Sequence, residues 1–359
     1  MFYYEGCNGF AHERLSRRGR HSLQYEARKA KSKMAQPTTA VLDREKPAAR
    51  KPGASLSLFD EAISTLSSPQ SASPPYIGTQ GWSVPGWQGL LYPTGLRPNR
   101  RLAIYARVFN SVEVNSTFYA IPSPQTVRGW YDDTPPGFKF ALKAPRAITH
   151  ERRLRESGRE LAEFLAVAEV LGDKLGPILI QLPPGFGPGA LPALSEFLRL
   201  LPVDSMQFCV EVRHPSLRSP GVRSLLHRRG VGMVTTNLLA EPGEIETLSG
   251  LAYLRLLGAR RVPGPDHQPD PSTMTMEQFA SETAMWTAGL RRAAENAGND
   301  VYAFVSNDYY GPGVLPAAQL KKHLGMPTQL RSGAFYTFFG YAPAANAGNT
   351  GAPVQGQLL

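Results

Sequence analysis

The chain has 359 residues, a net charge of +10 and 42% hydrophobic residues, enough for one large or two ordinary domains with a sizeable core. No apolar run approaches the roughly 18 residues that a membrane-spanning helix needs, and the N-terminus lacks the apolar region of a secretory signal. The two cysteines, Cys7 and Cys209, form neither a disulfide framework nor a Cys-x-x-Cys metal motif. These features exclude a membrane-embedded protein and a disulfide-stabilised secreted one, and they predict a cytoplasmic protein.

Residues 1–74 are predicted to form a disordered tail. Two basic clusters, at 17–20 and 28–33, are followed by a stretch rich in Pro, Ala and Ser. The tail holds 12 Lys and Arg against 7 Asp and Glu, about half of the net charge. Two interpretations stay open: an arm for nucleic acid or targeting, or a segment upstream of a true start at Met34. Residues 342–359, rich in Gly, Ala and Asn, are predicted to be a second disordered tail.

From Tyr76 onward, strand-like and helix-like segments alternate. Apolar and β-branched runs predict strands at 76–79, 111–115, 138–143, 178–182, 207–212, 231–236, 251–256 and 301–305. Helical spacing of apolar residues predicts helices at 101–108, 123–131, 156–175, 191–201, 222–229, 276–296 and 315–324. Eight strands alternating with helices favour an α/β fold, a (β/α)8 TIM-type barrel over residues 75–341. Neither a GxGxxG fingerprint nor a P-loop is present, so no nucleotide cofactor is predicted.

Polar side chains close every predicted strand, and in this fold the site lies at the C-terminal strand ends. We therefore predict one shared pocket there. Its expected catalytic residues are Glu113, Lys143 and Glu211. Its expected ligand-binding residues are Thr79, Trp82, Asn115, Tyr119, Gln181, Arg213, His214, Asn237, Arg255, Asn307 and Asp308.

These residue types allow several chemistries. Glu113 and Glu211 suit an acid and base pair, or divalent-metal ligands together with histidines near the strand ends. Lys143 suits an ion pair with either carboxylate, a phosphate contact or a Schiff base. Arginines such as Arg213 and Arg255 suit bidentate binding of an anion, and aromatic faces near the mouth suit a sugar or a base. Topology makes Glu113 the expected partner of Lys143.

The motifs together resemble the DUF72 family, also called YecE-like. The matching stretches are IGTQGWSVPGW (77–87), VEVNSTFY (112–119), PPGFKFALKAPRAITH (135–150), ILIQLPP (178–184), VEVRHPS (210–216), YLRLLG (253–258) and YAFVSNDYYG (302–311). The resemblance implies a TIM-type barrel and no defined activity. Two positions depart from the family pattern: Leu257 stands where a His often precedes Gly, and Pro316 stands where an Asn often precedes Ala.

Three functions follow as expectations. The first is a barrel enzyme of hydrolase or lyase type acting on a small polar or phosphorylated substrate. The second is a nucleic-acid-binding or repair protein similar to metal-dependent barrel endonucleases. The third is a barrel that binds a ligand without turnover.

Overall fold

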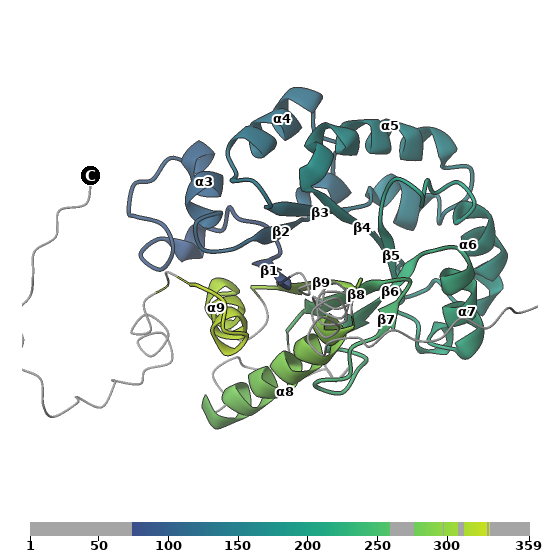
Figure 1. Ribbon diagram of the computed structural model, residues 1–359. Helices are drawn as coiled ribbons and strands as arrows, with labels where there is room; N and C mark the ends of the chain where they lie inside the picture. The colour runs from purple at the N-terminus through teal and green to yellow at the C-terminus, as the bar shows by residue number, and fades with distance from the viewer. Residues whose placement is uncertain (1–73, 259–275, 297, 308–311, 329, 331–359) are drawn as a thin grey trace, which may run out of the picture. The chain divides into compact units, whose positions relative to one another are not determined.

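The computed structural model describes residues 74–258, 276–296, 298–307, 312–328 and 330 (Figure 1). The two predicted tails lie outside this range apart from Pro74, as do Met34 and Asp308. Among the described residues, no helix is both long and apolar enough to cross a membrane.

Eight parallel strands form a sheet that is nearly closed into a barrel, in the order β1-β9-β8-β6-β5-β4-β3-β2. The strands are β1 (Tyr76–Thr79), β2 (Ser111–Val114), β3 (Lys139–Lys143), β4 (Leu175–Gln181), β5 (Phe208–Glu211), β6 (Gly232–Thr236), β8 (Leu251–Leu256) and β9 (Asp300–Val305). The predicted (β/α)8 TIM-type barrel is confirmed, and each predicted strand overlaps an observed one. A further strand of two residues, β7 (Thr247–Leu248), pairs antiparallel with β8 and was not among the predicted strands.

Helices cover the outside of the barrel (Figure 1). They are α3 (Arg101–Tyr105), α4 (Pro124–Asp132), α5 (Gly158–Ala168), α6 (Leu191–Phe197), α7 (Pro220–Arg228), α8 (Met276–Glu295) and α9 (Val314–His323). Two of them start in the same way, because Ser123 and Ser219 each accept a backbone N–H through the side-chain oxygen and precede a proline. The predicted helix 156–175 is too long: α5 ends at Ala168, and a 3-10 segment with Gly172 at φ 49° follows.

The barrel closes between β1 and β2 through a side chain. The Tyr105 hydroxyl accepts a hydrogen bond from the Thr79 N–H at 2.8 Å and donates one to the Ser111 carbonyl at 2.9 Å. A Cβ atom on Gly78 would lie 2.0 Å from that carbonyl oxygen, so only glycine allows this approach. Beyond Thr79 the backbones pair directly, because Gly81 N–H donates to the Glu113 carbonyl at 2.8 Å.

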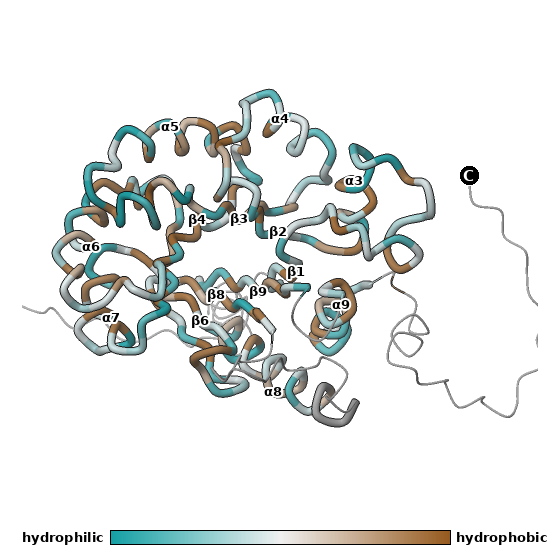
Figure 2. Tube along the Cα trace, turned by 180° about the vertical axis from the view of Figure 1, so that it is seen from behind, coloured by the Kyte–Doolittle hydropathy of each residue, from teal (hydrophilic) through white to brown (hydrophobic). Residues whose placement is uncertain are grey.

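Two hydrophobic layers enclose the sheet. One fills the space between the helices and the outer faces of the strands, and Figure 2 shows hydrophobic residues concentrated on the strands and the inner sides of the helices. The other fills the barrel and is formed by Ala141, Leu179, Cys209, Val234, Leu251, Tyr253, Tyr302 and Phe304. Side chains alternate along a strand, so the residue two positions after an inward one also points inward. That rule places Lys143, Gln181, Glu211, Thr236 and Arg255 together at the C-terminal end of the barrel interior.

Candidate functional site

A chain of ion pairs centred on Arg255 crosses the barrel interior. Arg255 donates from Nε to Glu113 Oε2 at 2.9 Å and from Nη2 to Glu113 Oε1 at 2.8 Å. Its remaining nitrogen, Nη1, donates to Glu211 Oε2, and Arg213 Nε donates to Glu211 Oε1. Both carboxylates are fully buried and Arg255 is 2% exposed, so none of these charges could stay inside without its partners.

Both carboxylates of the network face guanidinium groups, and those around Glu211 favour its charged form. Burial opposes ionisation of Glu211, but the guanidinium groups of Arg255 and Arg213 lower its pKa below the ordinary value. Tyr253 adds a further bond, donating from its hydroxyl to Glu113 Oε2 at 2.8 Å. Because a general acid must carry a proton, this pattern disfavours the acid and base pair of a glycoside hydrolase.

Lys143 stands beside this network without joining it. No ion pair joins its Nζ to a described carboxylate, so the expected pair with Glu113 is wrong; Arg255 takes that place. Instead Nζ lies 3.9 Å from the centroid of the Phe118 ring, a cation–π contact. The pKa of Lys143 falls to about 8: burial has the largest effect, Arg255 adds to it, and Glu113 and Glu211 offset only part.

His150 lies against the same aromatic ring. Its ring packs edge-on against Phe118, with centroids 4.9 Å apart, and its Nδ1 is 2.8 Å from the Thr149 hydroxyl. Burial lowers the pKa of His150, and the charges of Lys143 and neighbouring arginines lower it further. The imidazole is therefore neutral at pH 7 and able to accept a proton.

Three buried polar atoms at the C-terminal strand ends have no hydrogen-bond partner among the described residues: Gln80 Nε2, Asn115 Oδ1 and Thr236 Oγ1. They follow or end three different strands, β1, β2 and β6. An unsatisfied buried polar group costs roughly 1–3 kcal/mol, so such groups gathered at one end of a barrel suggest a ligand that satisfies them.

Several predicted site residues are engaged in holding loops. Asn237 bridges the segment after β8, accepting from Leu257 N–H and donating to the Gly258 carbonyl, both at 2.8 Å. Asn307 Oδ1 accepts from Trp87 Nε1 at 2.9 Å and from Gly313 N–H at 3.0 Å. Thr79 donates to the Gly81 carbonyl at 2.7 Å, and His214 Nδ1 accepts from Ser216 N–H.

The other predicted residues have varied positions. The Trp82 ring packs edge-on against that of Trp130, with the ring centroids 5.4 Å apart. The Tyr119 side chain is 79% exposed. Gln181 is half-buried and pairs in register with Glu211. Asp308 lies outside the described residues.

Sequence reasoning missed Tyr253 as a partner of Glu113. The sequence feature that indicates this residue is the position of Tyr253 two residues before Arg255, on the same face of β8. Strand patterning places both residues inward, but it does not show that the tyrosine reaches across the barrel to another strand.

No three His, Cys, Asp or Glu side chains gather as metal ligands within the described part of the chain. Glu113 and Glu211, the carboxylates expected to bind a divalent metal, already face guanidinium groups. The donor set shown here does not fit a metal centre, because a ligand carboxylate needs its lone pairs free for the ion.

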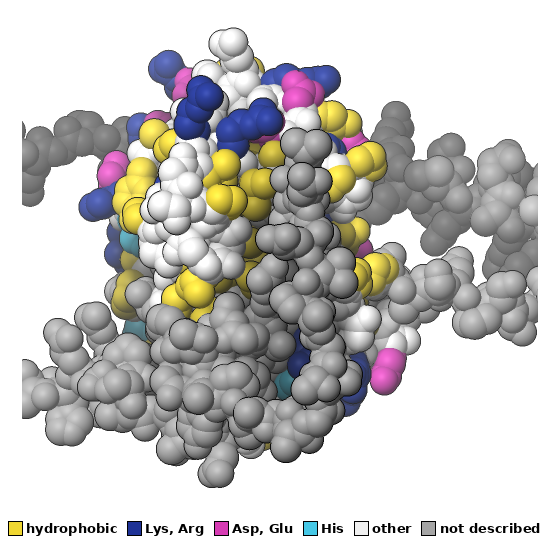
Figure 3. Space-filling view, turned by 90° about the vertical axis from the view of Figure 1, so that its left-hand side faces the viewer, with side chains coloured by type: hydrophobic (Ala, Val, Ile, Leu, Met, Phe, Trp, Pro, Cys, Tyr) yellow, Lys and Arg dark blue, Asp and Glu magenta, His cyan; other side chains and the backbone are white. Residues whose placement is uncertain are grey.

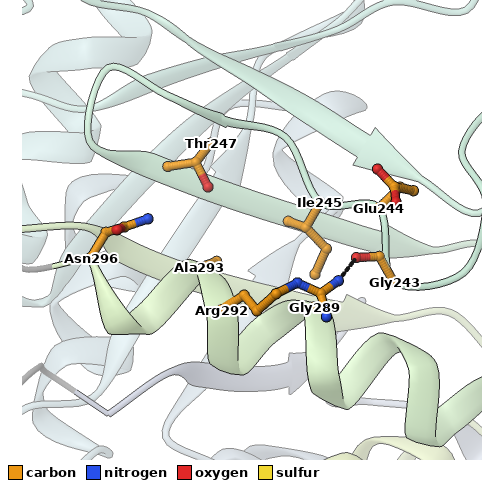
Figure 4. A pocket seen from close by; sticks show the side chains of 8 residues that line it. All are labelled: Gly243, Glu244, Ile245, Thr247, Gly289, Arg292, Ala293 and Asn296. Carbon is orange, nitrogen blue, oxygen red and sulfur yellow. Dashed lines mark hydrogen bonds between the residues drawn. The ribbon is translucent and has the colours of Figure 1, made fainter.

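Two hollows lie away from this network. One, of about 230 Å³, lies between α8 and the loop that follows β6, where Arg292 donates to the Gly243 carbonyl at 2.8 Å (Figure 4). The other, of about 220 Å³, lies at the opposite end of the barrel, against the stacked rings of Tyr76 and Tyr302. Neither contains the buried ion pairs.

A family model described as "Protein of unknown function DUF72" matches residues 76–334. The chain belongs to the DUF72 family. The protein YecE of Escherichia coli (strain K12) is 40% identical over 164 residues, which are 44% of this chain and 57% of YecE. The match therefore spans little more than half the length of that relative. YunF of Bacillus subtilis (strain 168) is 31% identical over 117 residues, which are 31% of this chain and 40% of YunF.

Solved structures of DUF72 family proteins share the barrel. One from Thermotoga maritima superposes with a TM-score of 0.57 and 25% identity, covering 70% of this chain and 99% of that one. One from Enterococcus faecalis gives a TM-score of 0.56 at 18% identity, over 71% of this chain and 99% of that one, which shows the fold alone.

Proposed function

We propose that this DUF72 barrel is an enzyme that acts on a small anionic substrate at the C-terminal mouth of its strands. The observation that carries the proposal is the amine of Lys143, which has no ion-pair partner within the described part of the chain. It lies beside a network in which both buried carboxylates are already paired with arginines. Three cations, Lys143, Arg213 and Arg255, face two anions, Glu113 and Glu211, so the cluster has an excess positive charge.

Arg213 supplies the second anion-binding group. Its Nε is bound to Glu211, while its Nη1 and Nη2 have no partner among the described residues. Its side chain is 24% exposed, so a ligand can reach these nitrogens. A guanidinium held in place by one bond presents its remaining N–H groups as a fixed fork, which suits a carboxylate or a phosphate.

Of the hydrolase and lyase types, the residues support a lyase better. Hydrolysis by paired carboxylates needs one of them protonated, whereas Glu211 is held ionised by two arginines. A lysine amine of lowered pKa is instead a nucleophile or a base near neutral pH.

A thermal-shift screen of phosphorylated and carboxylated metabolites, against their uncharged analogues, tests this function. We expect anionic compounds to raise the Tm of the full chain and Lys143→Met to abolish the shift without unfolding the protein. Each hit is then incubated with the protein, and its conversion is followed by NMR.

Two results would contradict the proposal. Stabilisation without conversion would favour a barrel that binds without turnover. Preference for an oligonucleotide, with affinity falling steeply as salt rises, would favour the nucleic-acid alternative.

A further inference from the structure

We propose that Lys143 is a nucleophile that forms an imine with a carbonyl group of the anionic substrate. This inference rests on the proposed function, because Arg213 must hold the substrate's anion while Lys143 reacts. It goes further by naming the reacting atom, Nζ, and the substrate class, an aldehyde or ketone that carries a phosphate or carboxylate.

The surroundings of Nζ favour a free amine. A lysine that is merely structural is expected to end on a carboxylate or on backbone carbonyls, and this chain provides two such examples. Lys174 Nζ donates to the Tyr131 and Thr134 carbonyls, each at 2.6 Å, and Lys321 Nζ donates to the Val108 carbonyl. Lys143 Nζ has no such acceptor among the described residues and lies on the Phe118 ring.

Arg255 explains why the amine stays unpaired. It binds Glu113 through two nitrogens and Glu211 through a third, so the nearest carboxylates are occupied. Its positive charge also disfavours a proton on Lys143, adding to the effect of burial that brings the pKa to about 8. Because Arg255 binds both carboxylates, Lys143 has no carboxylate counter-ion among the described residues.

The chemical step is balanced without any oxidant or reductant. The lone pair of the neutral amine attacks the carbonyl carbon, and the C=O π electrons move to oxygen, which takes up a proton. Nitrogen loses a proton, and the hydroxyl then leaves as water after protonation, so that a C=N bond replaces the C=O bond. His150, neutral and packed on the same Phe118 ring, is placed to accept and return the proton.

The orphaned atoms at the mouth fit the same substrate class. Gln80 Nε2 is a donor for a carbonyl or phosphate oxygen, and Asn115 Oδ1 is an acceptor for a hydroxyl group or for the carbinolamine O–H. Asn115 follows β2, the strand that pairs with β3. Gln80 follows β1 and forms a bridge to Glu113 of β2. A phosphorylated or carboxylated hydroxy-carbonyl compound would satisfy them together.

Pyridoxal 5′-phosphate, an aldehyde with a phosphate, is the probe for the test. The full chain is incubated with it, the imine is reduced with borohydride, and labelled peptides are quantified by mass spectrometry. We expect Lys143 to be labelled at least tenfold faster than the exposed Lys322, with half-maximal rate near pH 8. Pyridoxal, which lacks the phosphate, should label Lys143 at least tenfold more slowly.

Variants and an unreactive analogue separate the two claims. Lys143→Met and Lys143→Arg should lose the label, and Arg213→Gln should slow it; melting curves confirm that each is folded. Pyridoxine 5′-phosphate has the same anion but no aldehyde, so its thermal shift reports anion binding alone. If it stabilises the protein while Lys143 is labelled no faster than Lys322, the imine is refuted and the anion site stands. If it does not bind and Lys143 is not labelled, both claims fail.

Discussion

Arg255 is the residue on which the barrel interior depends. It is 2% exposed and holds Glu113 and Glu211, which are both fully buried. Its ion pairs are not evidence of net stability, since dehydrating these three charges offsets much of their attraction. Removing one of these charged residues should nevertheless lower the stability of the protein strongly, because its partner charge stays buried.

Arg255→Met should therefore destabilise the protein by about 3–5 kcal/mol at pH 7, because it leaves the buried Glu113 without a cationic partner among the described residues and Glu211 with Arg213 alone. Urea unfolding measures the loss, and Arg213→Met is the matched control. Arg213 is 24% exposed and binds only Glu211, so its replacement should cost about 1 kcal/mol. Equal losses for the two variants would show that Arg255 does not anchor the network.

Replacing Lys143 should have the opposite effect on stability, because burial of its charged amine destabilises the folded protein. Its folded pKa, about 8, lies below the ordinary 10.5, so between these values the unfolded chain binds more protons and stability rises with pH. Below pH 8 the cost is fully present. Allowing for solvent screening of a half-buried amine, Lys143→Met should stabilise the protein by about 1–2 kcal/mol at pH 7.

Unfolding measured at pH 7 and again at pH 10 tests this directly. The gain from Lys143→Met should shrink as the pH rises. A variant less stable than the parent at pH 7 would mean that the ammonium group has a stabilising partner.

At the scale of elements, the strands were largely predictable. Continuous apolar runs define β4 and β8, and Ser-Pro pairs mark the starts of α4 and α7. The end of the helix at Ala168 was not predictable, because the apolar spacing continues through Leu171 while the backbone changes to a 3-10 segment that contains Gly172 at positive φ. Strand β7 is two residues long and has no period to detect.

The junction of β1 and β2 gives the prediction at this scale. Gly78→Ala should cost at least about 3 kcal/mol, since its Cβ would meet the Ser111 carbonyl oxygen at 2.0 Å and neither backbone can move alone. Gly129→Ala, in α4 with open space around it, is the control. It should stabilise by about 0.5–1 kcal/mol through helix propensity.

Thermal melting of the two alanine variants provides the comparison. Two folded variants of equal Tm would show that β1 and β2 do not need the close approach that the Tyr105 hydroxyl bridges.

For the whole molecule, the sequence predicted the barrel and the end of it that carries polar side chains. Inward alternation brings Lys143, Glu211 and Arg255 to one end, as strand patterning implied. Which of these charged side chains pair with one another was not predictable, since the pairs form across the barrel interior. Arg255 contacts Glu113, which lies on a strand remote in both sequence and sheet order. Family resemblance could not supply the pairs either, because it fixes residue types and not partners.

The face of the molecule in Figure 3 gives little further guidance to function. On the face at the left of Figure 1, basic side chains gather at one end while hydrophobic ones are interspersed with polar groups (Figure 3). Scattered hydrophobic side chains are ordinary on a protein surface. The interior network is therefore the stronger guide to what this protein binds.

The proposed anion site depends on a Lys143 amine that no described carboxylate neutralises, and NMR can measure the pKa of that amine. The Nζ and Cε signals of ¹³C,¹⁵N-lysine-labelled protein are followed from pH 6 to 11, with Lys143→Arg to assign the resonance. We expect a pKa of about 8 for Lys143, rising when inorganic phosphate or pyridoxine 5′-phosphate binds, because a nearby anion favours the ammonium form. A pKa near 10.5 that neither anion changes would contradict the account.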